Sequence, residues 1–504
     1  MNTRMNKSRF VTPEDQSGRL GRVEMLVNGR PAASRSGQWF GIQEPATQVT
    51  LAEVPRGTSE DVAGAVDAAA AAFATWRRTP PAERGQALLR IADDLEADSE
   101  RLARLLAAET GNALRTQARP EMASTSDTFR YFGGVSREFK GETVPLGPDL
   151  LSYSVREPYG VVGAVVPWNS PVLLAAMKIA MAVTTGNTIV VKAAEDAPLA
   201  VLAMGEIINR HVPAGVVNIL TGYGPECGQP LLESPGVAKL SFTGSTVIGK
   251  LAMRIAAERV LPVTLELGGK SPAIVFPDRD DDDTVAGVIA GMRFTRQSQS
   301  CTAGSRLLLH KSIFDSFLEK LVKQIDGLRI GDPLAEDTDI GSLINEKQYR
   351  RVCSYLTDDE ARAATTLTGG APAEHEAQEP GFFVHPTILT GVDPAWRVAR
   401  EEVFGPVLVA LPWSEPVEAV AMANDTHYGL AAYVWGGDIS AALSVAHAID
   451  AGWVQVNRGG GQLLGMSYGG RKESGLGHEF SLEGALEGFT HRKSITVNLA
   501  AAGR

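Results

Sequence analysis

The amino-acid sequence predicts an α/β protein that is built on mostly parallel sheets. Between residues 160 and 267, short β-branched runs alternate with segments of helical length, and a second alternating block covers residues from about 268 to 470. Strands that alternate with helices of about 10–15 residues indicate βαβ units, in which the strands are parallel. Right-handed crossovers place the functional loops of such units at the carboxyl ends of the strands.

Two amphipathic helices are expected before the first of these strands. Ser59 can cap the first, whose apolar residues recur at every third or fourth position: Val62, Val66, Ala69, Phe73 and Trp76. Pro81 is well placed at the start of the second helix and Gly111 at its end. Its apolar stripe is formed by Leu88, Ile91, Leu95, Leu102 and Leu105.

The remaining elements follow from the same patterns. Buried strands are predicted at 160–166, 187–192, 216–220, 239–243 and 263–265, and helices at 171–183 and 199–211. The second block is expected to hold a helix at 284–294, a strand at 306–310 and a helix at 346–356, with polar loops at 277–283 and 372–380. The tail at 494–499 alternates like a strand, and a terminal strand usually pairs with another, often from a second subunit.

Composition and charge exclude several classes of function. The chain has 504 residues, and 48 Lys plus Arg against 59 Asp plus Glu give a net charge of −11. Nucleic acid and anionic membranes need a basic surface, so neither is expected as a partner. No run of about 20 uninterrupted apolar residues could span a bilayer, and residues 1–21 are a polar arm rather than a signal peptide. Three scattered cysteines fit a reducing, cytoplasmic location, and no metal-ligand spacing is found.

Cys301 is the cysteine best placed to act as a nucleophile. It lies in a polar segment of small residues (RQSQSCTAG) between a predicted helix and a predicted strand. A nucleophilic thiol needs access and a stabilised thiolate, and an exposed polar loop can supply both. Taken alone, the segment fits an inert cysteine equally well. Cys227, in a turn rich in Gly and Pro, and Cys353, on a predicted helix, are expected to be inert.

Two further candidates follow predicted strands. Glu266 precedes Gly268 and Gly269, which let backbone, ligand and side chain approach closely, although a surface acid at a turn is the simpler interpretation. Asn169, in the segment PWN, could donate a hydrogen bond to a developing oxyanion or could cap the next helix.

Several weak signals point to nucleotide binding. The segment 221–228 departs from GxGxxG because its last gap is too long. The segment 242–249 is a glycine-containing turn from strand to helix, which can offer backbone N–H groups to phosphate. Lys192 and Glu195 follow a strand directly, where a cation and an acid can bind ribose hydroxyls.

Together these segments resemble the NAD(P)-dependent aldehyde dehydrogenase superfamily, in its hydrolytic, non-acylating branch. Seven motifs match the order and spacing of the family: PWN at 167–169, KAAE at 192–195, FTGST at 242–246, ELGGK at 266–270, QSC at 299–301, EEVFGP at 401–406 and YGGRKESG at 468–475. The resemblance extends over residues 22 to 499. It implies a Rossmann-type coenzyme domain, an α/β catalytic domain and a small β oligomerisation element.

The resemblance also implies how the chain is divided. The coenzyme domain would comprise residues 22–136 and 157–267, and the catalytic domain residues 268–480. The oligomerisation element would combine residues 137–156 with 481–504, and a homodimer or homotetramer is expected. Residues 1–21 remain outside as the polar arm.

The resemblance implies a role for each catalytic candidate. Cys301 would attack the aldehyde, Asn169 would donate to the resulting oxyanion, and Glu266 would activate water as a general base. The implied reaction converts an aldehyde, NAD⁺ and water into a carboxylic acid and NADH through a thiohemiacetal and a thioester. Lys178 matches a position that supports the active site in many members.

The implied cofactor is NAD, with NADP less favoured. Lys192 and Glu195 match the family's contacts to the adenosine ribose, and an acid at 195 would repel a 2′-phosphate. Ser245 matches the pyrophosphate contact, and Glu402 and Phe404 match residues that hold the nicotinamide ribose and ring. Trp168 and Gly244 complete the implied cofactor contacts.

Departures from the family pattern bear on the substrate. Ser170 replaces a common aromatic residue, Arg296 a common Asn and Ser298 a common Gly, and the segment 458–461 lacks the usual bulky side chains. These changes predict an open pocket, with expected substrate contacts from Ser170, Ser300, Thr302 and Arg458. Arg296 or Arg458 could bind the carboxylate of a semialdehyde, but a solvated surface or a structural ion pair is the simpler role.

Two other functions stay open at this point. A CoA-acylating semialdehyde dehydrogenase would pass the thioester to coenzyme A and needs no water-activating base, so Glu266 argues against it. A non-catalytic scaffold protein of the same fold would have no use for Cys301, Glu266 and Asn169 together.

Overall fold

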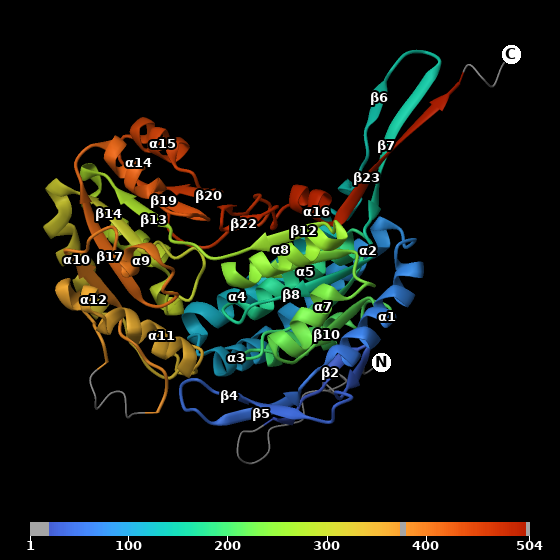
Figure 1. Ribbon diagram of the computed structural model, residues 1–504, viewed down its shortest axis with the longest axis horizontal. Helices are drawn as coiled ribbons and strands as arrows, with labels where there is room; N and C mark the ends of the chain where they lie inside the picture. The colour runs from blue at the N-terminus through green and yellow to red at the C-terminus, as the bar shows by residue number, and fades with distance from the viewer. Residues whose placement is uncertain (1–19, 373–379, 500–504) are drawn as a thin grey trace.

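Three structural parts are seen in the computed structural model, which describes residues 20–372 and 380–499. Two α/β lobes lie side by side, and a three-stranded ribbon projects from one of them (Figure 1). The predicted α/β fold class is confirmed. The predicted polar arm and the loop predicted at 372–380 lie almost wholly outside the described residues.

The first lobe is built on an eight-stranded sheet of order β22-β12-β11-β8-β9-β10-β2-β3, in which β12, β11, β8, β9 and β10 run parallel. Most of their residues are buried, as expected of a sheet covered on both faces. Every strand predicted between 160 and 265 is present within one residue of its expected bounds. The strands are β2 (Met25–Val27), β3 (Arg30–Ala32), β8 (Val161–Val165), β9 (Thr188–Lys192), β10 (Val217–Leu220), β11 (Lys239–Thr243), β12 (Val263–Glu266) and β22 (Gly475–Leu476).

The helices of this lobe differ from the expectation in two places. The N-cap of the first is Thr58 rather than Ser59, and the Asp61 carboxylate accepts hydrogen bonds from the Thr58 backbone and hydroxyl at 2.8 and 3.0 Å. The long helix predicted from Pro81 is two helices, because the backbone leaves helical geometry at Asp98 (φ −106°, ψ 11°). The helices are α1 (Ser59–Trp76), α2 (Pro81–Ala97), α3 (Ser99–Thr110), α4 (Arg119–Gly134), α5 (Pro171–Thr184), α6 (Leu199–Ile208), α7 (Gln229–Glu233) and α8 (Thr246–Arg259).

The second lobe contains a seven-stranded sheet of order β15-β16-β17-β14-β13-β19-β20, parallel except at the β15 edge. Its strands are β13 (Pro272–Val275), β14 (Arg306–His310), β15 (Thr365–Thr368), β16 (Thr387–Thr390), β17 (Val407–Trp413), β19 (Ala431–Trp435) and β20 (Trp453–Val456). Its helices are α9 (Asp282–Met292), α10 (Phe314–Asp326), α11 (Glu346–Thr357), α12 (Asp359–Ala363), α13 (Arg397–Arg400), α14 (Pro416–Asn424) and α15 (Ile439–Ala448).

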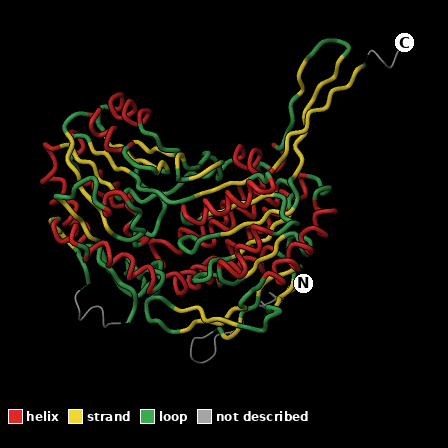
Figure 2. The backbone as a smooth tube through the Cα atoms, in the orientation of Figure 1, coloured by secondary structure: helices red, strands yellow, loops and turns green. Residues whose placement is uncertain are grey.

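The ribbon consists of β6 (Thr143–Pro145), β7 (Leu150–Pro158) and β23 (Thr490–Asn498), and it stands away from the body (Figures 1 and 2). The tail predicted as a strand therefore does pair, with β7 of the same chain over its whole length. Short α16 (Leu482–Phe489) precedes it. The other short strands are β1 (Gly21–Arg22), β4 (Trp39–Gln43), β5 (Thr50–Pro55), β18 (Tyr428–Gly429) and β21 (Arg471–Lys472).

The described part of the chain has no helix that is both long enough and apolar enough to cross a bilayer. It also has no group of three or more His, Cys, Asp or Glu side chains arranged to hold a metal ion.

Candidate active site

Segments of both lobes meet where β12 ends. Glu266 is the last residue of β12, and the chain continues through Gly268 and Gly269 toward the sheet of the second lobe. A Cβ at Gly269 would lie 2.4 Å from the carbonyl oxygen of Cys301, so only glycine lets the two segments come this close. The glycine pair noticed in the sequence therefore brings the Glu266 strand against the turn that carries Cys301.

The Cys301 turn is packed rather than exposed, so the prediction of an exposed polar loop is wrong. Gln297, Ser298 and Gln299 are each 1% exposed, and the first two adopt left-handed backbone conformations. The two glutamine side chains make hydrogen bonds inside the protein, whereas Ser298 Oγ has no partner among the described residues. Gln299 Oε1, for example, accepts a hydrogen bond from the backbone N–H of Ile344 at 3.1 Å.

The Cys301 thiol is partly buried and lies beside a tyrosine. Its Sγ is 3.7 Å from the hydroxyl oxygen of Tyr468. Burial raises the pKa of Cys301 to about 11, and the hydrogen bond from Tyr468 and the positive charge of Arg293 act in the opposite direction. The thiol therefore needs further stabilisation to become a thiolate at neutral pH.

Asn169 lies against the same turn. Its Nδ2 donates to the carbonyl oxygen of Gln299 at 2.9 Å, two residues before Cys301. A side-chain amide carries two hydrogens, so the second can serve another acceptor. The residue at the N-cap of α5 is Ser170, so Asn169 does not have the alternative capping role.

Glu266 is buried without a hydrogen-bond partner. It is 4% exposed, and neither carboxylate oxygen is paired among the described residues. Burial and the negative charge of Glu479 raise its pKa well above the ordinary value, and Lys178 opposes the shift. Lys178 Nζ in turn donates to Glu479 Oε1 at 2.7 Å and to Ser241 Oγ at 2.9 Å. Glu266 is thus a carboxyl group with free oxygens and an elevated pKa, as a general base requires.

The candidate cofactor contacts of the first lobe lie at the carboxyl ends of its parallel strands. Lys192 ends β9, and its Nζ donates to Glu195 Oε2 at 2.6 Å. The Glu195 side chain is 42% exposed, so its carboxylate can accept from a ribose hydroxyl. Gly244 follows β11, and Ser245 is the N-cap of α8, where backbone N–H groups point outward.

Three further predicted cofactor residues gather beside Gly268 and Gly269. The rings of Trp168 and Phe404 meet edge to face at 5.3 Å, and Phe404 has a positive φ of 58°. Glu402 Oε1 accepts from the backbone N–H of Gly269 at 2.9 Å, and burial raises the pKa of Glu402 to about 7. The segments at 168, 268–269 and 402–404 therefore enclose the space next to the Cys301 turn.

The predicted substrate contacts differ in how far they are buried. Ser170 and Ser300 are 3% and 7% exposed, and Thr302 is fully buried. The hydroxyls of Ser300 and Thr302 lie 3.1 Å apart and satisfy each other. Arg458 is exposed on the segment after β20.

Arg296 is engaged in a structural ion pair, the role weighed above against carboxylate binding. Its guanidinium donates to Ser170 Oγ and, through Nε, to Gln117 Oε1 at 2.7 Å. Nη2 lies 3.7 Å from Glu121 Oε2, and the Glu121 side chain is fully buried. This cluster ties α4 to the residue next to Asn169 and to the turn before Cys301.

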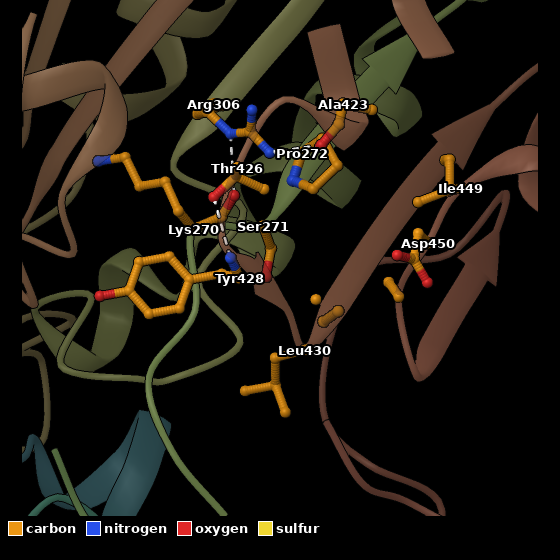
Figure 3. A pocket seen from close by; sticks show the side chains of 13 residues that line it. Lys270, Ser271, Pro272, Arg306, Ala423, Thr426, Tyr428, Leu430, Ile449 and Asp450 are labelled. Carbon is orange, nitrogen blue, oxygen red and sulfur yellow. Dashed lines mark hydrogen bonds between the residues drawn. The ribbon is translucent and has the colours of Figure 1, made fainter. Parts of the chain in front are cut away.

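A small cavity lies behind the site, between Lys270–Pro272 and Tyr428–Ala431 (Figure 3). Its volume of about 10 Å³ has room for about one water molecule. Lys270 Nζ donates to the carbonyl oxygen of Val398 at 2.7 Å, and burial lowers the pKa of Lys270 to about 7. At this volume the cavity is too small to hold an aldehyde substrate, and none of the predicted site residues lines it.

Three contributors to the site were not found from the sequence: Tyr468, Arg293 and Glu479. Tyr468 and Glu479 come from segments far from Cys301 in the chain, and an antiparallel bridge pairs the two residues. Arg293 has a left-handed conformation at the end of α9, and a Cβ at Gly461 would lie 3.4 Å from its Nη2. Tyr468 begins a recognised motif, which was the one available signal.

Comparison with known proteins agrees with this arrangement. The sequence model of the aldehyde dehydrogenase family matches residues 32–495. The chain belongs to the aldehyde dehydrogenase family. Its site is therefore that of an enzyme that oxidises aldehydes, and the resemblance drawn from the seven motifs is confirmed.

Individual relatives cover nearly the whole aldehyde dehydrogenase chain. A hydroxyisobutyraldehyde dehydrogenase of Mycolicibacterium austroafricanum is 40% identical over 94% of each chain. An acetaldehyde dehydrogenase of Pseudomonas aeruginosa is 38% identical, also over 94% of each. An aldehyde dehydrogenase from Bacillus cereus, solved with NAD⁺, has a TM-score of 0.93 and 36% identity, covering 97% of this chain and 99% of that one.

Proposed function

We propose that this aldehyde dehydrogenase oxidises its substrate with NAD by a hydrolytic thioester mechanism, in which Cys301, Asn169 and Glu266 are the catalytic residues. The observation that carries the proposal is the convergence of these three on one turn. The Asn169 amide bonds to Gln299, and Gly269 brings the Glu266 segment against the Cys301 backbone.

The first half of the reaction uses the sulfur and its donors. Cys301 Sγ, as a thiolate, bonds to the aldehyde carbon, and the carbonyl oxygen becomes an oxyanion. The free amide hydrogen of Asn169 and the backbone N–H of Cys301 donate to that oxygen. Bound NAD supplies a hydride acceptor, so that loss of the aldehyde hydrogen leaves a thioester on Cys301.

The second half uses Glu266. As a carboxylate, it takes a proton from water, and the oxygen of that water bonds to the thioester carbon while the carbon–sulfur bond breaks. The products are the carboxylic acid and the Cys301 thiolate. Lys178 and Glu479 lie in the same buried charge cluster, and their opposing effects on the pKa of Glu266 determine how readily it gives up its own proton.

NAD is favoured over NADP by the charge at the adenosine end. The Glu195 carboxylate is held by Lys192 and is partly exposed, so it can accept from a ribose 2′-hydroxyl but repels a 2′-phosphate. We expect kcat/KM for NAD to exceed that for NADP. Equal values of kcat/KM for NAD and NADP would show that Glu195 does not select between the two cofactors.

The decisive experiment follows NADH formation over a panel of aldehydes with and without coenzyme A. Acid and NADH should form in equal amounts, with no requirement for coenzyme A. Faster formation of acyl-CoA than of acid would instead support the acylating alternative. Absence of NADH with every aldehyde would support a non-catalytic scaffold.

The relatives named above are named for different aldehydes. The residues around Cys301 are therefore the guide to the substrate class of this chain. Arg296 is balanced by Glu121, whereas Arg293 makes no ion pair within residues 20–372 and 380–499, and its Nε has no hydrogen-bond partner there. Gly461 lies beside the Arg293 guanidinium and adds no side chain over it. Since the charge of Arg293 acts on Cys301, we infer that the preferred aldehyde carries an anionic substituent that Arg293 binds.

A comparison of arginines tests this inference. Arg293→Gln should lower kcat/KM for a semialdehyde about 10–100-fold, and should leave a neutral aldehyde of equal length almost unaffected. Arg458→Gln is the matched control, because Arg458 is exposed. If only the Arg458 variant lost the preference for the semialdehyde over the neutral aldehyde, the assignment to Arg293 would be overturned.

We also propose the division of the chain into a coenzyme domain (22–136 and 157–267), a catalytic domain (268–480) and an oligomerisation element (137–156 and 481–504). The ribbon and the exposed apolar side chains on and after α8 support a homodimer or homotetramer. On and after that helix, Val247, Met253 and Val260 are 75%, 50% and 90% exposed. Val247→Asp with Met253→Asp should reduce the mass measured by sedimentation; an unchanged mass would contradict this interface.

A cytoplasmic location is the last part of the proposal. The three cysteines of the chain are unpaired, which suits a reducing compartment. Cell fractionation should recover the enzyme with cytoplasmic markers.

A further inference from the structure

The hydroxyl of Tyr468 lies next to the sulfur of Cys301, the proposed nucleophile. Tyr468 Oη lies 3.7 Å from Cys301 Sγ, a distance at which a hydroxyl donates to sulfur. Tyr468 is 4% exposed, so water does not compete freely for this contact.

The tyrosine is held in a fixed frame. Its ring meets Phe480 and Trp453 edge to face, at 5.3 and 5.8 Å between centroids. Its backbone N–H donates to Glu479 O at 3.1 Å, and its carbonyl accepts from the Glu479 N–H at 2.7 Å. The hydroxyl therefore keeps its place as the charge on the sulfur changes, which is what electrostatic preorganisation requires.

The direction of the hydrogen bond follows from which of the two groups holds its proton more strongly. Burial and the neighbouring Cys301 and Glu266 raise the pKa of Tyr468 well above its ordinary value, so the phenol keeps its proton. When the sulfur is ionised, the Tyr468 hydroxyl is therefore the donor and the Cys301 thiolate is the acceptor.

We propose that Tyr468 is a further catalytic residue, whose hydroxyl donates a hydrogen bond to the Cys301 thiolate. It stabilises the thiolate before attack and again when sulfur leaves the thioester carbon. No proton is transferred between the two groups. The inference rests on the proposed role of Cys301 as nucleophile.

The test measures the reactivity of the thiol itself. Alkylation by iodoacetamide is followed from pH 6 to 10 (roughly the working range of the reagent) in a Cys353→Ser background. Cys227 is fully buried, so the signal in this background comes from Cys301. A Cys301→Ala variant gives the blank.

Tyr468→Phe keeps the packed ring and removes only the donor. A hydrogen bond to a charged group is strong enough that its loss should raise the Cys301 pKa by about one unit or more. Because a more basic thiolate is also a better nucleophile, alkylation below the pKa should fall by about three- to fourfold per unit. Gln462 lowers the pKa of Tyr468, so Gln462→Leu should weaken the Tyr468 hydroxyl as a donor and move the profile in the same direction by less. It provides a second test if the Phe variant folds poorly.

Tyr433→Phe is the matched control. It also removes a buried hydroxyl near the turn, but this hydroxyl donates to the Thr302 carbonyl at 2.9 Å and not to sulfur. Its alkylation profile should match that of the unaltered enzyme. Identical profiles for Tyr468→Phe and the unaltered enzyme would overturn the proposal for Tyr468 alone, whereas aldehyde oxidation by Cys301→Ala would overturn the nucleophile assignment.

Discussion

Cys227 and Cys301 are two thiols of the same chain with similar burial costs and different surroundings. Burial raises the pKa of Cys227 to about 12 and that of Cys301 to about 11. Cys227 lies in the apolar cluster of the first lobe, within the segment that follows β10. Cys301 has a hydroxyl donor, an amide and a carboxyl group around it. The comparison teaches that the thiol proposed to react differs from the inert one in both access and neighbours, since Cys301 is only partly buried and Cys227 is fully buried.

The largest expected effect separates the two cysteines completely. Cys301→Ala should abolish aldehyde oxidation, because no thiohemiacetal can form, and NAD binding should be retained. Cys227→Ala should keep kcat within about twofold, since a buried inert thiol contributes packing only. NADH formation and NAD binding by fluorescence titration measure both variants. Aldehyde oxidation by Cys301→Ala would contradict the proposed difference between the two cysteines.

Glu266 is expected to give the next largest effect. Glu266→Gln should lower steady-state turnover by about 10²–10⁴-fold through slow deacylation, leaving a burst of NADH equal to the enzyme present. The burst is measured by stopped-flow absorbance. A proportional loss of both burst and steady state would place Glu266 in the acylation step instead.

The same variant has a pH signature. The folded-state pKa of Glu266 is raised above its ordinary 4.5, so the folded state binds more protons and is destabilised as pH rises above 4.5 toward the folded pKa. Glu266→Gln removes this penalty. Its melting temperature should therefore exceed that of the unaltered enzyme by a margin that grows with pH in this window; a constant margin would contradict the raised pKa.

Asn169 tests the donor side of the Cys301 surroundings. Asn169→Ala removes one oxyanion donor and should lower kcat by about 10²–10³-fold while leaving KM for NAD nearly unchanged. Asn112→Ala serves as the control, because its side chain reaches only the Asn169 carbonyl, at 3.4 Å. Equal losses in both variants would mean that Asn169 acts by holding the backbone.

Sequence patterns predicted the parallel sheets well and the packing of the active-site turn poorly. The strand that ends in Glu266 and the glycines after it could be found because burial and close approach restrict residue type directly. The burial of the Cys301 turn could not, since its polar side chains find partners as distant in sequence as Ile344. Arg296 shows the same limit: its buried partner Glu121 lies on α4, with nothing in the local sequence to link them.

The long helix predicted from Pro81 failed for a related reason. Its apolar stripe continues through Asp98, and periodicity alone does not register a single residue that leaves helical geometry. Tyr468 was within a recognised motif, yet the position of its hydroxyl depends on pairing with Glu479 and packing on Phe480. Such roles are set by tertiary contacts rather than by local patterns.

The smallest effect concerns the inert cysteine. Cys227 is fully buried among apolar side chains, so Cys227→Ser places a hydroxyl where the sulfur made no hydrogen bond. An unpaired buried hydroxyl costs about 1–3 kcal/mol, while Cys227→Ala loses only the packing of one sulfur atom. We expect the Ser variant to melt at or below the temperature of the Ala variant at equal protein concentration, with kcat unchanged in both. If Cys227→Ser melted above Cys227→Ala, the hydroxyl would have found a partner, and the apolar surroundings that separate Cys227 from Cys301 would not be as described.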